Sequence, residues 1–279
     1  MTRDPRLTPA RADFAAESLR GVFEAKRYVA GEARVVAVPV APVRRDPHPT
    51  APLDTEALMG EAVTVYDSDA EGWSFVQLAG DSYVGYMPSD ALRVAEGPAT
   101  HLVCAPRTFL FPGPDIKLPP LGTLPFGARL RLSEERGAFL RGPDGFLFAA
   151  HLAPLDSREA DFVDVAGRFL GTPYLWGGRS AFGFDCSGLV QTALSACGIA
   201  CPRDSDMQEA ALGAPVSLDG PFARGDLLFW PGHVAIVEAP QTLLHANAFH
   251  MNVAREPLEP ALARIAATNP LRAARRLSL

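Results

Sequence analysis

The 279-residue sequence contains only four cysteines, and it has neither a long apolar run nor an extended basic stripe. Four cysteines are too few for a disulfide-built scaffold of this length. No stretch reaches the ~18–20 consecutive apolar residues of a membrane span. With a net charge of −6 and no basic stripe, nucleic acid is not an expected partner. Because 48% of the residues are hydrophobic and 21% are charged, we expect a globular protein of two or three domains.

The N-terminal segment lacks the unbroken apolar core of a secretory signal, because charged residues recur from Arg3 to Asp13. We therefore expect a cytoplasmic protein. In a reducing compartment its cysteines are expected to be core residues or reactive thiols. Cys104, Cys197 and Cys201 fit the first description, since no further ligands stand at a spacing suited to a metal site.

After a short helix expected over residues 8–20, the pattern changes to β-like runs separated by Asp, Gly and Ser. The stretch 39–52 is rich in proline and predicts a loop or extended linker. Strands at this spacing are typical of a small β-barrel. The expected strands are residues 34–38, 62–66, 73–78 and 83–87.

A weaker copy of this pattern follows. Residues 60–65 are echoed by residues 127–132, and residues 73–78 by residues 138–141. We therefore expect two related barrels of about 60 residues each. These segments resemble bacterial SH3-like domains, whose closing Gly-Tyr-x-Pro pattern stands here at residues 85–88.

Helical patterns appear in the remaining part of the chain. Apolar spacing predicts one helix over residues 158–170 and a second over residues 186–197. Two apolar strands are expected at 234–237 and 242–246, and helices followed by strands indicate an α+β domain. The expected domains are residues 1–96 (the N-terminal helix and first barrel), 97–156 (the second barrel) and 157–279 (the α+β domain).

Cys186 lies where a glycine-punctuated loop meets the second helix. A thiol at a helix N-terminus gains from the partial positive charge there, and its pKa can fall from ~8.5 towards ~3.5–7.5 beside a protonated histidine. We therefore expect a thiolate nucleophile at neutral pH. His233 and His245 stand in successive strands. If the hairpin between them centres on Ala239, they are directly opposed and share a face, so one can act as the base while the other orients it.

Four sequence blocks stand in order: Tyr-Leu-Trp-Gly-Gly (174–178), Asp-Cys-Ser-Gly-Leu-Val (185–190), Gly-Asp-Leu (225–227) and the two histidines. Together they resemble the NlpC/P60 family of papain-like cysteine peptidases, which cut bacterial cell-wall peptides. The resemblance implies that Cys186 is the nucleophile, His233 the general base and His245 the orienting residue. Tyr174 is similar to the family tyrosine at the oxyanion site.

The wider layout, two SH3-like domains before a papain-like domain, resembles the γ-D-glutamyl-L-diamino-acid endopeptidases of this family. The resemblance implies a murein peptide substrate, L-Ala-γ-D-Glu-diamino acid with a free N-terminus, in peptidoglycan turnover or recycling. This chemistry implies no cofactor. Residues that match the family's substrate groove are Asp185, Ser187, Asp204 and Ser205.

In that subgroup the first SH3-like domain supplies an acidic residue and a tyrosine that hold the substrate's amino group. Glu61 and Tyr86 are the candidates in this sequence, with Tyr83 in reserve. Holding the ammonium with a carboxylate would exclude acetylated or glycan-linked peptides, because burying an unpaired amine costs several kcal/mol.

Structural interpretations and two other functions stay open. Asp185 can merely cap the following helix, and Arg203 with Asp204 can form a surface ion pair. Trp176 is expected to pack beneath the site. The same catalytic residues would also serve an exported hydrolase of intact peptidoglycan. Alternatively, the SH3-like pair binds wall peptides and the Cys/His set is idle. The sequence predicts no oligomeric state.

Overall fold

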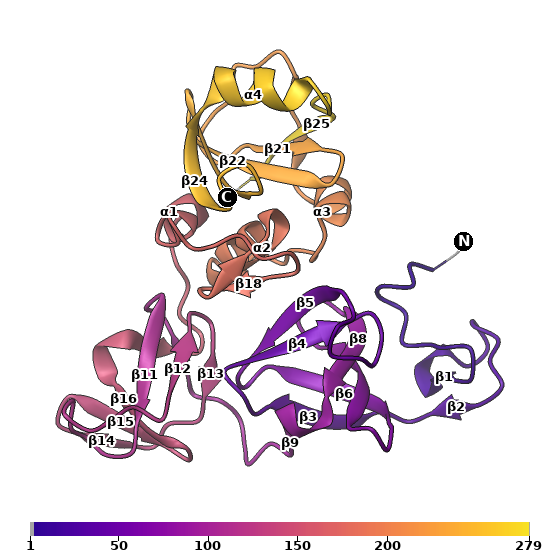
Figure 1. The fold of residues 1–279 in the computed structure, drawn as a ribbon, viewed down its shortest axis with the longest axis vertical. Helices are drawn as coiled ribbons and strands as arrows, with labels where there is room; N and C mark the ends of the chain where they lie inside the picture. Colours follow the sequence, from indigo (N-terminus) through magenta and orange to yellow (C-terminus); the bar gives the residue numbers. More distant parts are fainter. Residues whose placement is uncertain (1–2, 279) are drawn as a thin grey trace. The chain divides into compact units, whose positions relative to one another are not determined.

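The computed structural model describes residues 3–278 and divides into two compact units, residues 1–157 and residues 158–279 (Figure 1). Between residues 3 and 157 the chain forms strands and short 3-10 turns, with no α-helix. The second unit combines helices with one large sheet. No helix in the described part of the chain is both long and apolar enough to cross a membrane.

The first unit is dominated by a seven-stranded antiparallel sheet in the order β5-β4-β8-β7-β6-β3-β9 (Figure 1). The predicted strands at 62–66, 73–78 and 83–87 are confirmed as β6, β7 and β8. The strand predicted at 34–38 begins two residues earlier, as β3. The strand bounds are β3 (Glu32–Val36), β4 (Val40–Arg44), β5 (Leu53–Leu58), β6 (Ala62–Ser68), β7 (Trp73–Leu78), β8 (Val84–Pro88) and β9 (Leu92–Arg93).

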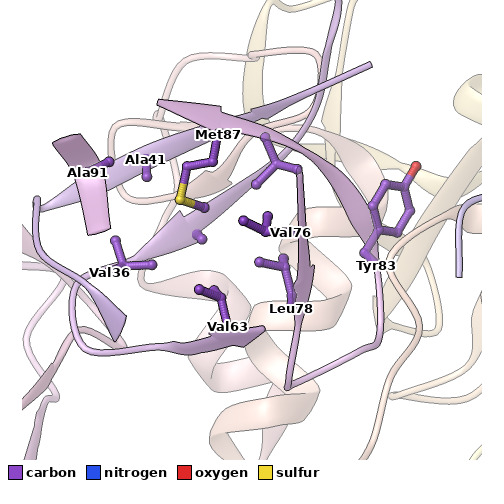
Figure 2. Packing of buried hydrophobic residues seen from close by; sticks show 10 residues of the cluster. Val36, Ala41, Val63, Val76, Leu78, Tyr83, Met87 and Ala91 are labelled. Carbon is purple, nitrogen blue, oxygen red and sulfur yellow. The ribbon is translucent and has the colours of Figure 1, made fainter. Parts of the chain in front are cut away.

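Apolar side chains from these strands meet in one buried core (Figure 2). Val63, Val76 and Met87 are at most 2% exposed, and they come from three adjacent strands. Their β-branched and flexible apolar side chains suit a half-buried pleated surface. Tyr83 belongs to the same core and is 4% exposed, so its ring is buried against the other core residues.

The helix predicted over residues 8–20 is wrong. The chain there forms β1 (Ala15–Ala16) and a 3-10 turn, η1 (Glu17–Leu19), and β1 pairs in parallel with β2 (Tyr28–Val29). Phe14, Ala15 and Ala16 are consecutive and all buried, whereas an amphipathic helix buries every third or fourth residue. The Phe14 ring packs edge-on against Phe75, with the ring centroids 5.8 Å apart. Tertiary packing therefore overrides the local helix preference of this segment.

The prediction of a loop over residues 39–52 is also wrong in part, because the segment contains strand β4. This strand pairs along its length with β5 but with β8 only at Arg44. Pro42 is tolerated within β4 because a strand that lacks a full ladder on one side does not need every N–H. The proline-rich composition could not show which backbone N–H groups of β4 would be needed for pairing with its neighbouring strands.

The rest of the first unit consists of two small sheets, with strand orders β13-β10-β17 and β12-β11-β16-β15-β14. The copied pattern yields strands where it predicts them, at β13 and β15, around a buried core of its own. That this part is an SH3-like barrel stays a prediction. The bounds are β10 (His101–Val103), β11 (Arg107–Phe111), β12 (Gly122–Pro125), β13 (Arg129–Leu130), β14 (Glu134–Arg136), β15 (Phe139–Gly142), β16 (Gly145–Phe148) and β17 (Leu152–Pro154), with 3-10 turns η2 (Ser89–Ala91) and η3 (Ala149–His151).

The second unit is an α+β domain whose six-stranded sheet has the order β20-β25-β21-β22-β23-β24 (Figure 1). The predicted second helix and both apolar strands are confirmed as α2, β22 and β23, whereas α1 is shorter than predicted. The bounds are α1 (Phe162–Gly167), β18 (Arg179–Ser180), β19 (Gly183–Phe184), α2 (Cys186–Ala196), α3 (Ser205–Ala211), β20 (Ala214–Pro215), β21 (Leu227–Trp230), β22 (His233–Ala239), β23 (Thr242–Asn247), β24 (Asn252–Pro257), α4 (Leu258–Ala266) and β25 (Ala273–Arg276).

The C-terminal stretch, for which the sequence suggests no role, completes this sheet. Strand β25 pairs with β21 on one side and β20 on the other. Helix α4 packs Leu258 and Ala261 against buried residues of the sheet, including Leu243. Helix α4 therefore covers the sheet face to which Leu243 points, and every second residue of β23 shares that face.

Candidate active site

Cys186 is the first residue of helix α2, and its side chain is buried with 6% exposure. The helix begins here because the Asp185 carboxylate accepts a hydrogen bond from the Gly188 N–H at 2.6 Å. Glycine at 188 is also required by packing, since a Cβ there would lie 2.2 Å from the carbonyl oxygen of Gly178. The glycine-rich loop thus closes directly against the first turn of the helix that carries the thiol.

The Cys186 sulfur lies beside the backbone on both sides of His233. Its Sγ is 4.0 Å from the Gly232 carbonyl oxygen, and the Val234 N–H is also placed to hydrogen-bond the sulfur. Gly232 has φ +72°, a conformation that favours glycine, in the turn joining β21 to β22. Cys186 is therefore brought against the turn that carries His233, although Gly232 of that turn is 46 positions away in the chain. That Cys186 and His233 act as nucleophile and base stays a prediction.

The two histidines are hydrogen-bonded, with His233 Nε2 2.9 Å from His245 Nδ1. They share a face, as predicted, but they are not directly opposed. Strands β22 and β23 pair Ile236 with Leu244, and a bulge follows Val237, so His245 lies diagonal to His233. The prediction placed the centre of the hairpin at Ala239, whereas Ala239 is itself paired with Thr242. Long aromatic side chains still meet across such a diagonal.

A carboxylate that was not predicted from the sequence lies behind the second histidine. Glu256 Oε1 lies 2.9 Å from His245 Nε2, and Arg264 donates to both carboxylate oxygens at 2.7 and 2.8 Å. These contacts hold the pKa of Glu256 down at about 2, with the His245 hydrogen bond as the largest cause. The sequence does place an acidic residue, Glu256, in the strand that follows His245. Whether that residue faces His245 depends on the strand register, which the sequence spacing does not define.

The expectation of a thiolate in the resting protein is wrong. Burial raises the pKa of the Cys186 thiol to about 12, and the neighbouring Asp185 carboxylate adds to the increase. Burial also lowers the pKa of His233 to about 3. Both groups are therefore neutral at pH 7, because desolvation of the buried site outweighs the helix N-terminus. The thiol proton must move to the imidazole during the attack rather than before it.

A pH profile of hydrolysis will test this neutral pair. An unperturbed histidine would lose half of its base form near pH 6.5. Because the pKa of His233 is about 3, we expect kcat/KM to stay level as the pH falls from 7 to 5. The measurement is the initial rate at low substrate concentration across that range, with folding followed by circular dichroism. A loss of activity centred near pH 6.5 in a folded protein would contradict the assignment.

Tyr174 lies in the loop before α2, and its backbone is fixed by a hydrogen bond from its N–H to the Met251 carbonyl. Burial raises the pKa of its hydroxyl, and an electrostatic interaction with Cys186 raises it further. The hydroxyl therefore stays protonated near the thiol and can donate to an oxyanion. Trp176, by contrast, is 67% exposed, so the prediction that it packs beneath the site is wrong.

The Asp185 carboxylate accepts hydrogen bonds from four protein residues. Its oxygens accept from the N–H groups of Gly177 and Gly188, from the Ser187 hydroxyl, and from Arg203 at 2.6 and 3.0 Å. Arg203 is 1% exposed, so the prediction of a surface ion pair at this position is wrong. Asp185 and Ser187 thus lock the loops around Cys186, and their contact with substrate stays a prediction.

Asp204 and Ser205 stand at the start of α3, where Asp204 is the N-cap without a side-chain capping bond. Both are half-buried. The Arg203 side chain next to them reaches Asp185, which ties this segment to the loop before the nucleophile. Their role in the substrate groove stays a prediction.

The two residues proposed to hold the amino group lie in the first unit. The Glu61 carboxylate accepts a hydrogen bond from the Leu58 N–H at 3.0 Å, which is the turn role typical of an acidic residue at a strand start. Tyr86 packs edge-on against Phe75, with the centroids 5.2 Å apart, and the Arg11 guanidinium lies 5.9 Å from its ring. A neighbouring cation is unfavourable for an ammonium. Amine binding by Glu61 and Tyr86 stays a prediction.

Comparison with protein families gives two matches. The profile of the NlpC/P60 family matches residues 171–264, which include Cys186 and both paired histidines. A profile described as the bacterial dipeptidyl-peptidase Sh3 domain matches residues 43–92, within the seven-stranded sheet.

Curated relatives and a solved structure extend these matches along the chain. A γ-D-glutamyl-L-lysine dipeptidyl-peptidase of Bacillus cereus is 30% identical over 238 residues, covering 74% of this chain and 71% of that protein. An enzyme of the same name from Bacillus subtilis is 32% identical over 196 residues, or 64% of each chain. The crystal structure of an NlpC/P60 family protein from Bacillus cereus has a TM-score of 0.75 at 25% identity, covering 88% of this chain and 99% of the other.

Proposed function

This chain belongs to the NlpC/P60 family and is a cysteine-type peptidase, and on that premise we propose that it hydrolyses the γ-D-glutamyl–diamino-acid bond of murein peptides that begin with a free L-Ala. The observation that carries the proposal is the buried Cys186 sulfur beside the backbone of His233, with His245 behind that imidazole. This arrangement supplies a nucleophile, a base and an orienting group.

Because the Cys186 thiol and the His233 imidazole are both neutral at rest, proton transfer accompanies the attack. As the Cys186 sulfur attacks the amide carbonyl carbon, its proton passes to His233, and the carbonyl oxygen becomes an oxyanion. The Tyr174 hydroxyl donates to that oxyanion, a contribution of roughly 3–4 kcal/mol for one good donor. The C–N bond then breaks, and His233 returns the proton to the departing amine nitrogen.

A thioester between Cys186 and the glutamyl carbonyl remains. Water attacks this thioester while His233 accepts a proton from the water. Collapse of the second tetrahedral intermediate releases the carboxylic acid and restores the Cys186 thiol. The cycle needs no redox step, and every proton that His233 takes up is returned.

The proposed bond draws support from the relatives. Two are named γ-D-glutamyl-L-lysine dipeptidyl-peptidases, and the matched Sh3 profile is also described by a dipeptidyl-peptidase. A dipeptidyl-peptidase by definition releases a dipeptide from an N-terminus, which motivates the free L-Ala. Both L-lysine and diaminopimelate are diamino acids, and we propose the class rather than one member.

The decisive experiment compares L-Ala-γ-D-Glu-L-Lys with its N-acetylated form, and the same pair containing meso-diaminopimelate. We expect L-Ala-γ-D-Glu and the free diamino acid as products from the unblocked peptides, and at least 10-fold lower kcat/KM after acetylation, because the site must then bury an uncharged group where it holds an ammonium. Equal turnover of blocked and free peptides would remove the free-amine requirement. Cleavage of neither would reject the proposed bond.

Hydrolysis of intact sacculi distinguishes the proposed enzyme from an exported hydrolase of intact peptidoglycan. We propose that the enzyme acts on released peptides during peptidoglycan recycling in the cytoplasm, and we therefore expect no soluble products from sacculi. Release of peptides from sacculi at a rate similar to that on free peptides would favour an exported hydrolase instead.

A further inference from the structure

We propose that Glu256 is a positioning residue: it fixes a proton on Nε2 of both His245 and His233 and so leaves Nδ1 of His233 as the bare nitrogen that accepts the thiol proton. The proposal rests on the cysteine-peptidase chemistry of the site and is independent of which peptide is cleaved. Its starting point is the row of contacts from Arg264 through Glu256 and His245 to His233.

The first link fixes the tautomer of His245. Glu256 accepts two contacts from Arg264, and its carboxylate is therefore ionised and cannot donate. The hydrogen bond of 2.9 Å between its Oε1 and His245 Nε2 must then be donated by His245. A neutral His245 with its proton on Nε2 has a bare Nδ1.

The tautomer of His245 in turn fixes the tautomer of His233. His245 Nδ1 lies 2.9 Å from His233 Nε2, and a bare Nδ1 can only accept. His233 must therefore donate from Nε2, which leaves Nδ1 as its only acceptor. A carboxylate two hydrogen bonds away thus selects which nitrogen of His233 accepts the thiol proton. The same two hydrogen bonds orient both imidazole rings.

Arg264 lies beside the Glu256 carboxylate that His245 contacts. The arginine comes from helix α4, on the face of the sheet where His245 lies, and it balances the charge of Glu256. His250 also approaches, with its Nδ1 3.2 Å from Glu256 Oε1 and the same distance from Asn247 Oδ1. With its charge already balanced by Arg264, Glu256 does not require a second cation at His245. A cationic His245 would donate from Nδ1 and force the His233 proton onto the wrong nitrogen.

The direct test is ¹⁵N NMR of the histidine rings in the wild-type protein at pH 7. We expect His233 and His245 each to show one protonated Nε2 and one bare Nδ1. This measurement requires neither substrate nor variant, so it stays informative if the proposed peptide bond is not cleaved. A proton on Nδ1 of His233, or a doubly protonated His245, would overturn the proposal.

Substitutions of Glu256 test whether its carboxylate determines the proton positions on the two histidines. With no acceptor in Glu256→Leu, His245 is expected to move its proton to Nδ1 and shift the His233 proton to Nδ1 as well. We expect kcat to fall about 10–100-fold with KM nearly unchanged. Glu256→Gln keeps an acceptor oxygen and should recover most of the rate and the original ring signals.

Glu238→Leu is the matched control, because it removes a carboxylate bonded to Arg255 on the same sheet without touching either histidine. It should leave kcat and the ring signals as in wild type. A folded Glu256→Leu protein with unchanged ring signals, or equal rate losses in both leucine variants, would contradict the positioning role. If Glu256→Leu does not fold, the wild-type ring signals and the glutamine variant decide the question.

Discussion

Replacing Cys186 with alanine is expected to lower kcat by about 10⁶-fold, because no other group in the site can form the thioester. The loss should reach the same level in His233→Ala and should not deepen when the two changes are combined, since nucleophile and base act as one unit. The measurement is product formation from the free murein peptide, under single-turnover conditions for the variants. Peptide binding by Cys186→Ala should persist.

Cys197→Ala provides the control for this result. Cys197 is a free cysteine directly after the last turn of α2, at the opposite end of the helix from the nucleophile. Its removal should leave kcat within a few-fold of wild type. A Cys186→Ala protein with more than a tenth of wild-type activity would rule out the covalent mechanism. Peptide binding by a wild-type protein that shows no hydrolysis would instead favour a wall-peptide-binding function for the chain.

The largest effect on stability is expected from Arg203→Met. Arg203 is fully buried and makes the 2.6 Å ion pair with Asp185, so its loss leaves an uncompensated carboxylate inside the protein. Breaking such a pair by removing one partner costs about 3–5 kcal/mol of the free energy of unfolding. Since Asp185 caps the helix that carries Cys186, kcat should fall as well. Urea unfolding followed by tryptophan fluorescence will measure the change.

The comparison variant is Arg224→Met. Arg224 pairs with Asp161 and Asp164 on the exposed surface of the same unit, where such pairs contribute about 0–1 kcal/mol. Equal losses of stability in the two variants would show that the pair between Arg203 and Asp185 contributes no more than a surface contact.

Local sequence was sufficient wherever the signal lies within a few residues. The stripe of apolar residues after Cys186 predicted α2 almost to its ends, and a β-like run between turn residues predicted β7 at its observed bounds. Conversely, the helix predicted over residues 8–20 does not form, because Phe14 and its neighbours gain more from packing on the sheet than from a helix turn. Local propensity is a weak preference that burial of an aromatic ring can outweigh.

From the sequence alone we predicted Cys186, His233 and His245 as the catalytic set and correctly located the elements that carry them, because helix starts and strand runs are properties of near neighbours. Only the tertiary structure decided the diagonal register of the histidines, the pairing of Arg203 with Asp185 and the place of Glu256 beside His245. These contacts depend on a bulge and on helix–sheet packing. The tertiary structure also decided that the thiol rests neutral, because burial sets the cost of charge and only the assembled core fixes burial.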